Sequence, residues 1–74
     1  MSGSGSTAQL VRMANQIAAN LAVQGEAAAI RDTAEHIRKF WDPRMRAAIA
    51  AVPPEDLTPI ARAAIAQLGA KPAA

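Results

Sequence analysis

Apolar side chains recur every three or four residues in the first part of the chain, which is the spacing of a helix with one buried face. Ser6 or Thr7 can cap the start of this helix, and Gly25 suits its end. The expected buried stripe consists of Leu10, Met13, Ala14, Ile17, Ala18 and Leu21. The pattern predicts a first amphipathic helix that turns these six side chains toward the core.

A second helix is expected from about Glu26 to Phe40. Its buried face is predicted to contain Ile30, Ala34, Ile37 and Trp41. On the opposite face the charges alternate in sign at intervals of four residues, as is typical of a solvated helix surface, at Arg31, Glu35 and Lys39.

Two proline-containing turns predict two further, shorter helices. Proline disfavours helical geometry in the residue before it but suits the first helical turn, so Asp42 can cap a helix over about 43–51. Thr58 can cap another helix that begins at Pro59 and ends near Leu68, before Gly69. The predicted fold is therefore all-α, a small bundle of about four helices with the last two short and proline-initiated.

The segments 42–50 and 58–66 match at six of nine positions, and each has an arginine at its fifth position. We interpret this similarity as two short amphipathic helices that follow the same pattern of a capping residue and an initial proline. Duplication is the alternative, but nine residues are too few to establish a repeat. A single helical domain is expected over residues 7–69, between a flexible leader at 1–6 and a flexible tail at 70–74.

The composition predicts a thin hydrophobic core. Alanine accounts for 20 of the 74 residues, and 18 larger apolar residues remain to fill the interior. Alanine favours helices but contributes little area to a core, so contacts from a partner could supply part of the stability. The chain has no cysteine, a formal net charge of +2 and no apolar run long enough to cross a membrane. Its first residues also lack the pattern of a secretory signal.

Catalysis and metal binding are not predicted. The single histidine, His36, has Asp32 one helical turn before it, but the sequence places no nucleophile or second acid beside this pair. One histidine without cysteines and with scattered carboxylates does not make a metal site. We expect a chain that is not an enzyme on its own and that holds no cofactor.

The densest cluster of positive charge surrounds the two aromatic residues, with Arg38, Lys39, Arg44 and Arg46 lying within nine residues. Adjacent helical residues point about 100° apart, so Trp41 is expected in the core and Phe40 at its margin. An aromatic side chain among arginines is typical of protein–protein interfaces. A basic helical module that binds nucleic acid is the alternative, with arginines on phosphates and an aromatic stacking on a base.

The segments LVRMANQIAANL (10–21) and HIRKFWDPRMRAAI (36–49) resemble the delta subunit of NAD-dependent, molybdenum-containing formate dehydrogenase. The resemblance extends over nearly all of residues 10–68. Together with the charge pattern, it leads us to predict partner-binding roles for Asn15, Gln16, Arg38, Phe40, Arg44 and Arg46. Structural roles are predicted for Trp41, Asp42, Pro43 and Met45.

This resemblance implies a cytoplasmic accessory subunit without redox cofactors of its own. The alpha subunit of such a complex would carry a molybdenum or tungsten bis-pterin guanine dinucleotide centre and iron–sulfur clusters. The beta and gamma subunits would carry FMN and further clusters that lead to the NAD site. The delta chain would bind the alpha subunit, support assembly or stability of the complex, and aid maturation of the molybdenum cofactor.

Overall fold

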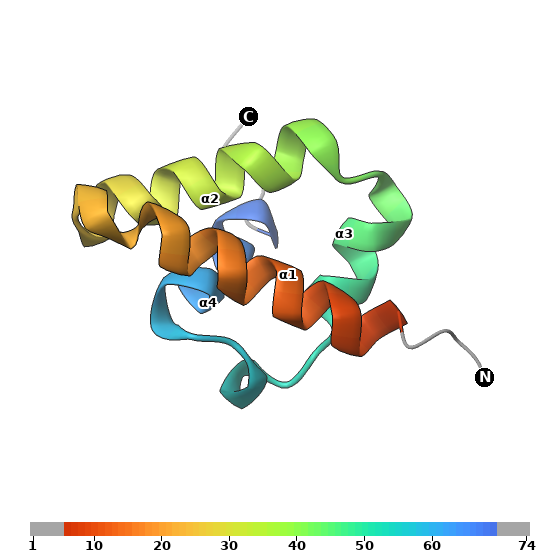
Figure 1. The fold of residues 1–74 in the computed structure, drawn as a ribbon. Helices are drawn as coiled ribbons and strands as arrows, with labels where there is room; N and C mark the ends of the chain where they lie inside the picture. The colour runs from red at the N-terminus through yellow and green to blue at the C-terminus, as the bar shows by residue number, and fades with distance from the viewer. Residues whose placement is uncertain (1–5, 70–74) are drawn as a thin grey trace.

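A computed structural model describes residues 6–69, and these residues form four α-helices and two short 3₁₀ turns (Figure 1). The α-helices are α1 (Ser6–Leu21), α2 (Glu26–Phe40), α3 (Pro43–Ala50) and α4 (Pro59–Gly69). The 3₁₀ turns are η1 (Ala22–Gln24) and η2 (Pro54–Asp56). No strand occurs among the described residues. The prediction of an all-α fold with two short, proline-initiated final helices is confirmed.

The helix ends lie close to the predicted positions. The first helix ends at Leu21, because the turn η1 precedes the predicted stop at Gly25. Gly25 has a φ of 101°, a conformation open to glycine and strained for other residues. The leader predicted for residues 1–6 and the tail predicted for 70–74 lie outside the described residues, except for Ser6, which begins α1.

Figure 1 shows α1 and α2 running side by side in opposite directions, joined at one end by η1. Helix α3 follows a sharp corner at the far end of α2, and a loop that contains η2 returns the chain to α4. Helix α4 packs mainly against α2 and also against α1. The result is a short helical bundle whose α1–α2 pair is covered by α4 on one side.

The core is built from side chains of all four α-helices and of the connections between them. Its buried residues are Leu10, Ala14, Ala18, Ile37, Trp41, Ile49, Leu57, Ala61 and Ile65. Three of these nine residues are alanine, as are six of the twelve buried hydrophobic residues in the described structure, so much of the interior is filled by closely approaching backbones rather than by large side chains. This agrees with the thin core that the composition predicts.

The predicted buried faces of α1 and α2 are partly wrong. Met13 retains 39% of its surface exposed, and Ile17 and Leu21 are only half-buried. Helix α1 buries a narrower strip, centred on Leu10, Ala14 and Ala18, and packs against α2, α3 and α4. On α2 the buried face is shifted, with Ala29 and Thr33 fully buried and the predicted core residue Ile30 only half-buried.

No helix in residues 6–69 combines the length and the apolar character needed to cross a membrane.

Candidate functional site

The corner between α2 and α3 is set by Trp41 and Asp42, which both have extended backbone conformations. The Trp41 side chain is 4% exposed and lies in the core. Asp42 caps α3, because its Oδ1 atom accepts a hydrogen bond from the Met45 backbone N–H at 2.9 Å. Pro43 occupies the first helical position, where its missing N–H leaves no donor unsatisfied. The chain therefore ends one helix and starts the next within two residues.

Arg46 reaches back across this corner to the end of α2. Its Nη1 atom donates to the backbone oxygen of Trp41 at 2.8 Å and to that of Arg38 at 3.3 Å. The last carbonyl groups of a helix lack partners within the helix and carry partial negative charge, so a guanidinium there is favourable. The sequence predicts Arg46 as a partner-binding residue, and the structure places its guanidinium in contact with the chain's own backbone.

The corner before α4 repeats this arrangement. Arg62 donates from Nε to the Pro54 oxygen and from Nη2 to the Leu57 oxygen, both at 3.1 Å. Leu57 is buried and extended, like Trp41, and Thr58 accepts a hydrogen bond from the Ala61 N–H at 3.4 Å. Each arginine thus contacts the carbonyl oxygens five and eight residues before it. The similarity of 42–50 to 58–66 therefore extends to the arginine side chain.

Asn15 of α1 forms two hydrogen bonds with the segment between η2 and α4. Its Nδ2 atom donates to the Asp56 oxygen at 3.1 Å, and its Oδ1 atom accepts from the Thr58 N–H at 2.9 Å. Both ends of the side-chain amide are therefore occupied within the chain. Gln16 is exposed and donates only to Asn20, at 3.3 Å, so its position on the outer face of α1 leaves it accessible.

The exposed part of the corner carries three cations. Glu35 forms ion pairs with Arg38 at 2.5 Å and with Lys39 at 3.7 Å. Arg44 is exposed and forms no ion pair with another described residue. Exposed pairs of this kind contribute about 0–1 kcal/mol, so these side chains can exchange their present contacts for those of a partner at small cost.

Phe40 lies beside these cations with 70% of its surface exposed. Its ring stacks at a tilt on the imidazole of His36, with the ring centroids 4.8 Å apart. Adjacent Trp41 is buried, so the two aromatics divide between core and surface. Met45, predicted to be structural, is partly buried against the core.

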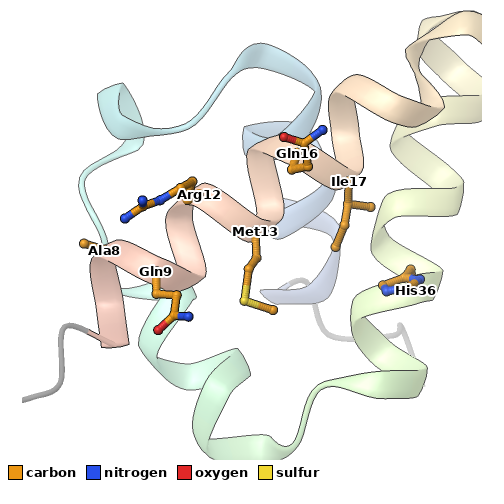
Figure 2. Close-up of a pocket in the computed structure, with 7 residues that line it drawn as sticks. All are labelled: Ala8, Gln9, Arg12, Met13, Gln16, Ile17 and His36. Carbon is orange, nitrogen blue, oxygen red and sulfur yellow. The ribbon is translucent and has the colours of Figure 1, made fainter.

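An open groove of about 740 Å³ lies between α1 and α2 (Figure 2). It is lined by Ala8, Gln9, Arg12, Met13, Gln16, Ile17 and His36. The apolar periodicity of the sequence predicts Met13 and Ile17 to be in the core, so the groove could not be anticipated from it. A usable signal was present, since α1 contains one charged residue in sixteen and therefore lacks an ordinary charged outer face.

The arrangement offers contact surfaces on the exposed side of the corner and of α1. In residues 6–69, no three histidine, cysteine, aspartate or glutamate side chains gather as potential metal ligands. The exposed residues at the corner supply an aromatic face and guanidinium donors, which suit recognition of another macromolecule.

Comparison with known proteins identifies one matching family. Residues 9–65 match the family model described as "NADH-dependant formate dehydrogenase delta subunit FdsD". Searches of curated proteins and of solved structures found no match. The matched region runs from the first turns of α1 to Ile65 in α4 and includes both arginine corners. The chain therefore belongs to the delta-subunit family of NADH-dependent formate dehydrogenases.

Proposed function

We propose that this chain is a non-catalytic subunit that binds the alpha subunit of a cytoplasmic formate dehydrogenase and supports assembly or stability of the complex. The observation that carries the proposal is the exposed aromatic and basic surface at the α2–α3 corner. Phe40 is 70% exposed beside the exposed Arg38 and Arg44, and aromatic and arginine side chains are enriched in protein–protein interfaces. Family membership supplies the identity of the complex.

The corner is well suited to hold such a surface in place. Trp41, Asp42 and Arg46 fix the angle between α2 and α3 through burial, capping and backbone hydrogen bonds. Phe40 and Arg44 lie on either side of this turn, so the backbone that carries them needs little further ordering when they bind. Binding then loses less conformational entropy, which favours affinity.

The cofactors of the complex belong to the partner subunits in this proposal. The alpha subunit would hold the molybdenum or tungsten bis-pterin guanine dinucleotide centre and iron–sulfur clusters, while beta and gamma would hold FMN and the NAD site. Aid to molybdenum-cofactor maturation is a narrower form of the same role. The two forms differ in whether the metal content of the alpha subunit depends on this chain.

Co-purification tests the proposal. A tagged chain expressed in its host should retain the alpha subunit, and the double variant Phe40→Ala, Arg44→Ala should retain much less. Arg31→Ala is a matched control, because Arg31 is an exposed α2 cation whose ion pair is with neighbouring Asp32, away from the corner. Recovery of the wild-type chain without any formate dehydrogenase subunit would overturn the proposed function.

Two further measurements separate the alternatives. Removing the chain should lower the amount of intact complex, and molybdenum per alpha subunit should fall as well only if the chain aids cofactor maturation. For the alternative of nucleic-acid binding, affinity for a generic duplex or single strand should fall steeply with added salt, because phosphate contacts release counterions. Strong salt-sensitive binding without a dehydrogenase partner would favour that alternative.

A further inference from the structure

The outer face of α1 is unusual for a helix surface exposed to water. Arg12 is its one charged residue, while α2 carries acidic and basic residues along its length. The exposed positions of α1 that line the groove are instead alanine, glutamine, arginine and methionine. Met13 and Arg12 are of residue types that are enriched in protein interfaces, and lysine, glutamate and aspartate, which are depleted there, do not occur among the lining residues.

Side chains from two helices make the apolar part of the groove. Figure 2 shows Met13 and Ile17 of α1 pointing into the space that His36 of α2 faces from the other side. Phe40 extends this surface toward the corner through its ring contact with His36. Met13 and Phe40 belong to the small set of large apolar residues that the described structure leaves exposed. The contact of Phe40 with His36 links the exposed Phe40 side chain to the groove that Met13 and His36 line.

The charge of the groove indicates what can occupy it. The described residues that line it include the cation Arg12 but no carboxylate. A partner that buried apolar side chains here would leave Arg12 near the edge of the interface, where a carboxylate on the partner could pair with it. An acidic side chain is therefore complementary to this surface, and a basic one would be repelled.

The shape of the groove favours a helix as the occupant. Neighbouring helices leave grooves between their rows of side chains, and a third helix can lay a ridge of side chains into such a groove, which here lies between α1 and α2. Amphipathic helices commonly bind in this way, with apolar anchors at intervals of three or four residues.

We propose that the groove between α1 and α2 binds an amphipathic helical segment of the formate dehydrogenase alpha subunit. The apolar side of that helix contacts Met13, Ile17 and Phe40, and a carboxylate beside its apolar ridge pairs with Arg12. The identity of the partner rests on the proposed function, whereas the location and the chemistry of the surface rest on the groove itself.

Titration of the full-length chain against a formate dehydrogenase complex assembled without it tests the inference. Met13→Glu places an acidic group among the apolar contacts and should weaken binding by at least about tenfold. Val23→Glu is the matched control, because Val23 is an apolar residue that is 90% exposed in η1, outside the groove, and its replacement should leave binding unchanged. Far-ultraviolet circular dichroism should show the same helix content in both variants.

Substitutions of Arg12 test whether the bound helix carries an acidic side chain. Arg12→Glu should weaken binding by about tenfold or more, while Arg12→Lys should retain most of the affinity because the positive charge is kept. A photo-reactive residue at position 13 should cross-link to an alpha-subunit segment with acidic residues beside an apolar stripe. These results together would support the proposed occupant.

Three results would overturn the inference. If wild type and Met13→Glu bind the complex equally, the docking surface lies elsewhere and the proposed function stands. If position 13 cross-links to a second copy of this chain, the groove serves self-association. If the wild-type chain binds no formate dehydrogenase subunit, the proposed function fails and this inference fails with it.

Discussion

The segment that precedes α4 is held by Arg62, and removing its guanidinium should lower the stability of the whole bundle. Arg62 bonds two backbone oxygens, those of Pro54 and Leu57. The substitution Arg62→Met keeps a long apolar stem and deletes both hydrogen bonds. The chain between α3 and α4 would then be fastened by Asn15 and by the burial of Leu57.

The magnitude follows from the number and setting of these hydrogen bonds. A hydrogen bond from a charged group contributes about 1.5–3 kcal/mol when buried. One of the two bonds of Arg62 is partly buried and the other is exposed, so solvent screening reduces the expected loss to about 1–2 kcal/mol in total. For a domain of this size, 1 kcal/mol shifts the melting temperature by about 4–8 °C. Arg62→Met should therefore melt about 5–15 °C below wild type.

Thermal melts followed by far-ultraviolet circular dichroism measure this effect. Arg62→Lys should recover little of the loss, because an ammonium group cannot present two donors in the fixed geometry of the guanidinium. Arg31→Met is the control, since the exposed pair of Arg31 with Asp32 should contribute less than about 0.5 kcal/mol. The difference between the two methionine variants should persist at high salt, because the partners of Arg62 are neutral carbonyl groups. Equal melting temperatures for Arg62→Met and Arg31→Met would refute the reasoning.

Three other substitutions test the core and the corner. Thr33→Val should raise stability by about 1 kcal/mol, because the Thr33 hydroxyl is buried without a hydrogen-bond partner among the described residues; unchanged or lower stability in a denaturant titration would contradict this. Trp41→Ala should cost about 3–5 kcal/mol and leave little folded protein, so a variant that melts like wild type would refute the importance of its burial. Asp42→Ala should cost about 1 kcal/mol through loss of the α3 cap, whereas Asp42→Asn should retain most of the stability.

The fold could be predicted because residues next to each helix end determine where that helix begins and ends. The proline turns, the Asp42 cap and Gly25 act on the residues next to them, so their effects can be read without knowledge of tertiary packing. Apolar periodicity also identified α1 and α2 correctly as helices. It misplaced the edges of their buried faces at Met13 and Thr33, because those edges depend on how the helices pack against one another in the bundle.

The candidate site was harder to predict because side-chain partners far apart in the sequence decide it. Asn15 contacts residues more than forty positions away, so its use within the chain could not be seen in the sequence. The backbone contacts of Arg46 depend on the fold of the corner, although the matching position of Arg62 was visible in the similarity of 42–50 to 58–66. The groove beside Met13 required knowledge of which apolar residues the bundle leaves uncovered.

The residues of the segment HIRKFWDPRMRAAI (36–49) form two groups whose variants should have different effects. Trp41, Asp42 and Arg46 are engaged in burial, capping and backbone hydrogen bonds, so their variants should lower the melting temperature first and lose partner binding only as a consequence. Phe40 and Arg44 are exposed, so their variants should lose binding while melting normally. Melting and binding measured on the same variants would show this separation. If Phe40→Ala unfolded the chain, or if Arg46→Met weakened binding without lowering the melting temperature, the division between scaffold and contact surface would be wrong.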